Sequence, residues 1–327
     1  MTAPQSTIFA VVDEPYCLWE VDVRARNLAF LNGIDAEYFE YLARSGVAAL
    51  DGAQDKKRAA ANLRLGFYNG TETLFSLLGA LLQAPSCAYA WMAQCATWQL
   101  RELLRRVNER DATLLVKVKL GHLSWEGIAK GVLAYSSSDP AKAERNGTLF
   151  GCLWDRLASE YLQDVHIKEY NSLKHGFRVR HGGFGMAVGI EHEYGVPPPP
   201  EEMQFLGASD FGSTFYVLDQ VGGEDRSNRS RRSRQVSVNW SAEGMVLALQ
   251  LISMSIRNVV SMLQILNGRK PSEVRFMRPS EDNDFDRPWE HSPSVLNAKL
   301  DFVIPEEAVK RTTKQELLDI WHKKEAR

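Results

Sequence analysis

The chain has 327 residues, a formal net charge of −2 at pH 7 and 44% hydrophobic residues. This apolar share is that of an ordinary globular protein with a substantial core, so the composition excludes a chain that is disordered throughout. The small net charge also excludes a protein that is basic along its whole length, and it restricts any nucleic-acid-binding surface to a local cationic patch.

Features of a membrane or secreted protein are not evident in the sequence. The first residues lack a basic start followed by an apolar run, which a secretory signal would need. The longest apolar stretches, 74–82 and 245–262, are interrupted before the roughly 20 residues of a membrane span. The four cysteines form no CxxC pair. We therefore expect a cytoplasmic protein with no membrane partner.

The first 34 residues are expected to form an N-terminal arm with short strands, because β-branched and aromatic residues cluster at 8–12 and 17–21. Helices are predicted after this arm. Asp35 and Asp55 are suitable N-cap residues, and the helix that follows Asp55 has helical periodicity as far as Gln83.

Helical periodicity continues through the next ninety residues. It predicts helices at 86–110, at 124–135 and from about 141 to 161, with a further helix leading to His175. The segment 114–118 fits either a strand or the start of a helix.

The pattern changes after His175. Glycines alternate with apolar residues up to 190, which predicts a β-hairpin, and the four prolines 197–200 predict a stiff extended link. Further strands are expected at 213–218 and 235–240. A long apolar helix should follow from 241 to 266, and a short amphipathic helix should occupy 314–323.

These elements predict an α+β protein that is predominantly α-helical. We assign residues 35–270 to a helical core domain that contains a β-rich insertion, 177–240, between its last two core helices. Residues 271–327 are assigned to a C-terminal extension that ends in a short helix.

The stretch from Tyr170 to Gly176 is the first candidate site. If its helix continued to Arg178, then Asn171, His175 and Arg178 would share one face. An imidazole that exchanges a proton near neutral pH would then lie beside a guanidinium that can bind phosphate. In the alternative, Gly176 ends the helix, Lys174 and His175 complement its negative end, and Arg178 belongs to the next strand.

The run Tyr-Asn-Ser-Leu-Lys-His-Gly resembles the signature helix of HEPN domains, in which an arginine, often followed by asparagine, precedes a histidine by four to six residues. Asn171, His175 and Gly176 match this pattern. The helix at 63–83 is similar to the long early helix that packs against the signature helix. Its candidate supporting residues are Tyr68, Asn69 and Glu72.

The resemblance, which covers about residues 56–180, implies a HEPN-like helical bundle paired as a homodimer. In active members it implies a metal-independent ribonuclease, with His175 as general acid or base and Asn171 as an orienting residue. This chain departs from the pattern, because Tyr170 occupies the position of the arginine and carries no positive charge. The cations that could replace it are Lys168, Lys174, Arg178 and Arg64.

A second candidate is an arginine-rich stretch expected to form a polar loop before the strand at 235–240. Five arginines within nine residues could grip a phosphate backbone, and they could equally be a solvated hairpin tip. They are Arg226, Arg229, Arg231, Arg232 and Arg234.

Other clusters predict no metal or cofactor. The alternation of a strand would point Glu191 and His192 to opposite faces, and the acids at 282, 284 and 286 lack the glycine and glutamate of a calcium loop. Two functions remain. One is an RNA-binding or RNA-cleaving HEPN-like component of a bacterial stress or defence system. The other is a noncatalytic helical dimerisation or interaction protein.

Overall fold

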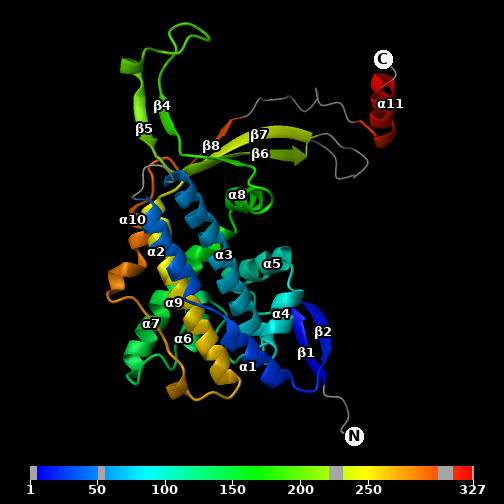
Figure 1. The fold of residues 1–327 in the computed structure, drawn as a ribbon, viewed down its shortest axis with the longest axis vertical. Helices are drawn as coiled ribbons and strands as arrows, with labels where there is room; N and C mark the ends of the chain where they lie inside the picture. Colours follow the sequence, from blue (N-terminus) through cyan, green and yellow to red (C-terminus); the bar gives the residue numbers. More distant parts are fainter. Residues whose placement is uncertain (1–5, 51–55, 221–230, 301–311, 326–327) are drawn as a thin grey trace. The chain divides into compact units, whose positions relative to one another are not determined.

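The computed structural model describes residues 6–50, 56–220, 231–300 and 312–325. About 55% of the chain is helical and 16% is strand, as the predicted α+β class dominated by helices requires. The chain divides into two compact units (Figure 1). Unit 1 comprises Met1–Tyr170 and Ala242–Ser292, and unit 2 comprises Asn171–Ser241 and Pro293–Arg327. The predicted insertion therefore lies within unit 2.

Unit 1 is a helical bundle. Its long helices α3 and α9 lie side by side, and α2 packs against both of them. The helices of unit 1 are α1 (Val23–Gly33), α2 (Tyr38–Leu50), α3 (Lys56–Gln83), α4 (Ala88–Gln94), α5 (Thr97–Asn108), α6 (Trp125–Val132), α7 (Pro140–Tyr161), α9 (Ala242–Leu266) and α10 (Arg287–Glu290), with 3-10 turns at Pro271–Glu273 and Asp282–Phe285. Helix α8 (Asp164–Lys174) carries residues of both units.

The core of unit 1 forms around α3 and α9. Helix α9 is long and apolar enough to cross a membrane, but 72% of its most apolar stretch is buried inside the protein, which is typical of a core helix. Glycines in α3 allow its neighbours to approach closely. A Cβ at Gly79 would overlap the indole of Trp91 in α4, and one at Gly70 would lie 3.0 Å from Ile252 Cγ2 in α9.

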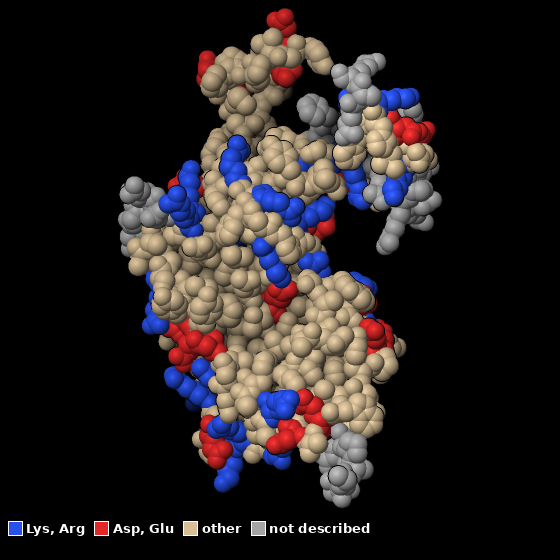
Figure 2. All heavy atoms as spheres, turned by 45° about the vertical axis from the view of Figure 1, so that its right-hand side comes forward, with Lys and Arg blue, Asp and Glu red and all other residues tan. Residues whose placement is uncertain are grey.

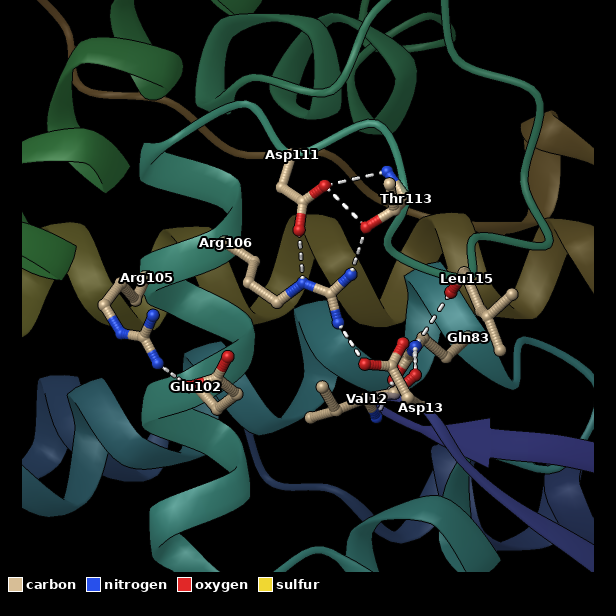
Figure 3. Close-up of polar contacts among 9 residues, drawn as sticks. All are labelled: Val12, Asp13, Gln83, Glu102, Arg105, Arg106, Asp111, Thr113 and Leu115. Carbon is tan, nitrogen blue, oxygen red and sulfur yellow. Dashed lines mark hydrogen bonds and ion pairs between the residues drawn. The ribbon is translucent and has the colours of Figure 1, made fainter.

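The N-terminal strands β1 (Ser6–Val11) and β2 (Glu14–Trp19) form an antiparallel hairpin. Short strands were predicted here, but their pairing was not. Figure 3 shows how two buried side chains, Gln83 and Arg106, hold its turn. The guanidinium of Arg106 in α5 donates to Asp13 Oδ2 at 2.6 Å, to Asp111 Oδ2 at 2.7 Å and to Thr113 Oγ1 at 2.8 Å. Arg106 therefore ties the hairpin turn to the loop after α5.

Three predictions for unit 1 are wrong. Helix α1 occupies Val23–Gly33, where an arm with short strands was expected, and the Asp22 side chain caps it by accepting a hydrogen bond from Ala25 N. The single helix expected at 86–110 is broken, because Cys95 and Ala96 have extended backbones; the Gln99 side chain accepts a bond from Ala96 N at 2.9 Å and starts α5. The segment 114–118 is neither strand nor helix. Hydrogen bonds to residues distant in the sequence hold this segment instead, including one of 2.7 Å from Lys117 N to Leu82 O.

Unit 2 contains a four-stranded antiparallel sheet with the order β3-β6-β7-β8. Its strands are β3 (Val179–His181), β6 (Gly212–Gln220), β7 (Arg231–Asn239) and β8 (Asn297–Leu300). One face buries Phe215, Val236 and Val238, in keeping with the period of two along each strand. Helix α11 (Lys314–Glu325) follows in the chain.

A separate two-stranded ribbon joins β4 (Gly185–Val188) to β5 (Gln204–Ala208) and stands away from the four-stranded sheet (Figure 1). The hairpin predicted at 176–190 is therefore wrong, because β3 pairs with β6 and β4 pairs with β5. The four prolines lie in the tip of this ribbon, and the last of them begins a 3-10 turn at Pro200–Glu202.

Candidate functional site

The buried side of α8 is fixed by an ion pair. Arg64 Nη2 of α3 lies 2.8 Å from Glu169 Oε2, and both side chains are almost completely buried. The hydroxyl of Tyr68 donates to the same carboxylate oxygen at 2.6 Å. Burial alone would raise the pKa of Glu169, but the charge of Arg64 and the hydrogen bonds from Arg64 and Tyr68 together outweigh it and hold this pKa below its usual value. The guanidinium of Arg64 is thus committed to Glu169, and Arg64 is a poor replacement for a phosphate-binding arginine.

Tyr170, which occupies the arginine position of the HEPN-like pattern, is a core residue of unit 1 with 2% exposure. Its ring stacks on Tyr68 with 5.0 Å between centroids. Its hydroxyl lies 2.8 Å from Asn69 Oδ1 and 2.6 Å from Glu72 Oε2, to which it donates. Burial and Glu72 raise the pKa of Tyr170 above its usual value. The structure thus brings Tyr170 together with all three predicted supporting residues, of which Tyr68 is buried, Glu72 is half-buried and Asn69 is exposed.

His166 is a half-buried residue beside Tyr68 and was missed in the sequence. Its ring packs edge-on against Tyr68, and its Nδ1 lies 3.1 Å from Glu160 O. Burial and then the charge of Arg64 lower the pKa of His166 to about 4, so the ring is neutral at pH 7. The available signal is its spacing, since positions 166, 169, 170 and 173 share one helical face.

Helix α8 ends at Lys174, so the extended helix that would align Asn171, His175 and Arg178 on one face does not form. Gly176 adopts φ +95°, which glycine tolerates and most residues do not. The backbone then turns, and Arg178 N donates to Ser172 O at 2.8 Å. The alternative prediction is confirmed at Gly176, which ends the helix, but Arg178 lies just before β3 and not in it.

The end of α8 nevertheless gathers several predicted site residues on the surface of unit 2. Asn171, Lys174, His175 and Arg178 are all exposed. Because the chain turns back at Gly176, Arg178 Nη2 lies 3.4 Å from the backbone carbonyl oxygen of Asn171. An imidazole and two cationic side chains therefore belong to one short turn. We call residues 171–178 the α8 turn.

Phe177 is the least expected residue of the α8 turn. It adopts φ +49°, a region that is rare and costly for a bulky side chain, and 56% of it is exposed. Sequence patterns predict the opposite, because an apolar residue just after a helix-ending glycine usually packs back on the helix. Strained residues of this kind cluster at functional sites.

The chain continues from the α8 turn into β3 and the exposed face of the four-stranded sheet. Strand register places Tyr216, Gln235 and Leu300 side by side on this face, with Leu218 next to Tyr216. Tyr216, Leu218 and Leu300 are each exposed by about two thirds. Arg180 lies opposite Thr214, and Arg231 opposite Gln220, on the same side. We call these residues the sheet face.

The arginine-rich stretch does not form one loop. Arg231, Arg232 and Arg234 belong to β7, whereas Arg226 and Arg229 lie outside the described residues. Alternation along the strand separates them, since Arg231 lies on the sheet face and the other two point to the opposite side. There Arg234 Nη1 pairs with Asp219 Oδ2 at 3.2 Å.

Within the part of the chain that the structure describes, no three His, Cys, Asp or Glu side chains are grouped as metal ligands. His192 pairs instead with Glu202, at 2.6 Å.

The chain matches no protein family model, no curated protein and no solved structure.

Proposed function

We propose that the protein binds single-stranded RNA through the α8 turn and the adjoining sheet face. The observation that carries the proposal is Phe177, an exposed aromatic ring that a strained backbone holds next to Arg178 and close to Lys174 and His175. Proteins that bind single strands combine aromatic rings, on which bases stack, with cations that contact the phosphates. Tyr216 provides a second exposed ring between Arg180 and Arg231.

Charge supports the same assignment. The segments that form the α8 turn and the four-stranded sheet, 171–184, 209–220, 231–241 and 293–300, contain seven lysines and arginines and two aspartates. Four of these cations, Lys174, Arg178, Arg180 and Arg231, belong to the α8 turn or the sheet face, whereas the register places the other three on the opposite side of the sheet. The chain as a whole has a net charge of −2. Such a local excess of cations attracts a phosphate backbone and gives affinity without reading sequence.

The test is a binding titration of the full chain with labelled single-stranded RNA of mixed sequence at several salt concentrations. Stacking on aromatic rings contributes about 1–3 kcal/mol per base, so Phe177→Ala should weaken binding by about fivefold to a hundredfold. Replacing Lys174 by glutamine should reduce the salt dependence by about 0.7 in log–log slope, the value for one phosphate contact.

Tyr135→Ala is the matched control, because Tyr135 of unit 1 is also half-exposed but lies outside the α8 turn and the sheet face. Unchanged affinity in both Phe177→Ala and Tyr216→Ala would refute the proposal. Parallel titrations with double-stranded RNA and single-stranded DNA distinguish single-strand stacking from simple attraction to phosphate.

RNA cleavage is a second candidate, because exposed His175 stands in the same turn as Lys174 and Arg178. In this scheme His175 transfers a proton, and one of the two cations stabilises charge on the phosphate in place of the motif arginine. Incubation of RNA with excess chelator should yield cleavage by the native chain and none by His175→Ala. Equal cleavage by both, or none by either, would leave RNA binding alone.

A HEPN-like bundle, acting in a bacterial stress or defence system in the cytoplasm, is also part of the proposal. Its support is the packing of α3 against α8 through Arg64, Tyr68, Asn69 and Glu72, which is the helix pairing that the resemblance implies.

A further inference from the structure

The β4–β5 ribbon and its tip, residues 185–208, have an unusual composition. This segment, which we call the arm, contains Glu191, Glu193, Glu201 and Glu202 and no lysine or arginine. Figure 2 shows the ribbon at the top of the view with acidic and uncharged atoms and none from Lys or Arg. Beside it in the sequence, the segments of the α8 turn and the four-stranded sheet carry an excess of five positive charges. Within unit 2, the arm is therefore acidic, whereas the α8 turn and the four-stranded sheet are basic.

The arm also exposes large apolar side chains. They are Val188 at 47%, Ile190 at 83%, Tyr194 at 101%, Val196 at 51%, Phe205 at 67% and Leu206 at 40%. A two-stranded ribbon by itself is marginally stable in water, and both of its strands present unpaired edges. The register places Val188 and Phe205 on opposite faces of the ribbon, so both faces expose apolar side chains. Exposed apolar surface rimmed by polar residues is typical of a protein interaction site.

Polar contacts within the tip of the arm fix its conformation. His192 Nε2 pairs with Glu202 Oε2 at 2.6 Å across the tip, and Glu191 Oε2 accepts a bond from Gly195 N at 3.1 Å. The positive φ of Gly195 closes the turn between them. These bonds leave Glu193, Glu201 and Tyr194 exposed. A preorganised arm loses little conformational entropy when it binds.

A surface that fits the arm occurs on the chain itself. The sheet face exposes Tyr216, Leu218 and Leu300 in one patch, with Arg180 and Arg231 on its rim. The arm does not cover this patch within its own chain, since the three apolar side chains stay exposed. The arm and the sheet face are thus complementary: both expose apolar side chains, and the glutamates of the arm can pair with the arginines of the sheet face.

We propose that the arm of one copy binds the sheet face of a second copy, and that the second arm binds reciprocally. Each copy carries one arm and one sheet face, so a twofold axis satisfies both contacts at once and closes the assembly as a dimer. Full burial of a Val, Leu, Ile or Phe side chain contributes about 1.5–3 kcal/mol. Five such side chains on each arm, together with Tyr194, can offset the roughly 4–15 kcal/mol that association costs.

The test is the mass of the full chain in solution, measured by sedimentation over a range of concentrations without RNA. The native chain should associate, and more weakly at high salt. Two charge reversals on the arm, Glu193→Lys with Glu201→Lys, should weaken association at least tenfold. Reversals on the sheet face, Arg180→Glu with Arg231→Glu, should do the same.

Combining the four reversals in one chain restores opposite charges at the contact, and association should recover in part. This recovery separates a direct arm–face contact from damage to the fold. Lys142→Glu, an exposed charge reversal on α7, is the control and should leave association unchanged. A native chain that stays monomeric, or reversals without effect, would overturn the proposal and leave the arm to a different, cationic partner.

If the sheet face also binds RNA, arm and RNA compete for it; this consequence alone rests on the proposed function. RNA should then dissociate the dimer, and the arm reversals should strengthen RNA binding. A dimer that forms without RNA and is unaffected by it would refute the shared face but not the self-association. A monomer that binds RNA would refute only the self-association.

Discussion

The side chain of Gln83 forms a two-way hydrogen bond with the backbone of Val12. Gln83 Oε1 accepts from Val12 N at 2.8 Å, and Gln83 Nε2 donates to Val12 O at 2.8 Å. The same amide group donates to Leu115 O at 2.8 Å. Val12 has φ +59°, an unfavourable conformation for a β-branched residue. Gln83 therefore compensates a strained hairpin turn and joins three distant segments of unit 1 (Figure 3).

Gln83→Ala should lower the free energy of unfolding by about 2–4 kcal/mol. The change leaves the buried Val12 N–H and C=O without these partners, and each unsatisfied group costs about 1–3 kcal/mol. Urea unfolding measures the effect. Gln163→Ala, which removes an exposed amide after α7, should change stability by less than about 0.5 kcal/mol. Equal effects of the two substitutions would contradict the role of Gln83.

The ion pair of Arg64 and Glu169 predicts non-additive mutations. Arg64→Met alone or Glu169→Leu alone should cost about 3–5 kcal/mol, because each leaves a buried charge without its partner. The double variant should be more stable than either single variant. Arg26→Met, at the exposed pair with Glu20, should cost under about 1 kcal/mol. Additive losses in unfolding experiments would show that the two charges are not coupled.

His166 predicts that stability depends on pH between about 4 and 6.5. The folded protein holds the pKa of His166 at about 4, below its ordinary value of 6.5, so in this window the unfolded chain binds more protons. Stability should therefore be complete above 6.5 and fall as the pH decreases to about 4, by at most about 3 kcal/mol. His166→Gln should flatten this part of the profile. A native profile identical to that of the variant would exclude His166 as its source.

Phe177→Gly should separate binding from stability. At φ +49° a residue with a side chain loses about 1–2 kcal/mol of stability, and glycine avoids this loss. Glycine is also more flexible in the unfolded chain, which lowers the free energy of unfolding by about 1 kcal/mol. Thermal unfolding should therefore change little while RNA affinity falls as in Phe177→Ala. A large loss of stability would mean that the ring supports the fold and is not a stacking surface.

Local signals predict the helices well, as α3 and α9 show. Both contain long apolar periodicities that a helix satisfies with its own backbone bonds, so neither needs knowledge of a distant partner. Sheet pairing is different. Nothing close to Val179 indicates that it lies opposite Phe215, thirty-six residues further along, because the pairing depends on tertiary contacts. The local hairpin prediction was therefore wrong.

The candidate site divides in the same way. Asn171 and His175 were singled out in the sequence as candidate residues, and so were Asn69 and Glu72 of α3, which contact Tyr170. Phe177 was not predicted as a site residue, because apolar residues are ordinarily assigned to a core. Its side chain is exposed only because the backbone turns at Gly176. The arginine-rich stretch was recognised in the sequence. That its arginines lie on two opposite faces of the sheet follows only from the register of β7, which the sequence does not give.

The pairing of α3 with α9 has a consequence for synthesis of the chain. The two helices pack together, although unit 2 contributes seventy-one residues, Asn171–Ser241, to the sequence between them. During translation, α3 therefore leaves the ribosome well before α9, and the apolar surface of α3 that packs against α9 stays uncovered until α9 has emerged. We expect the newborn chain to need protection over this interval, and we expect mutations that slow or unfold unit 2 during translation to lower the yield of a correctly formed unit 1.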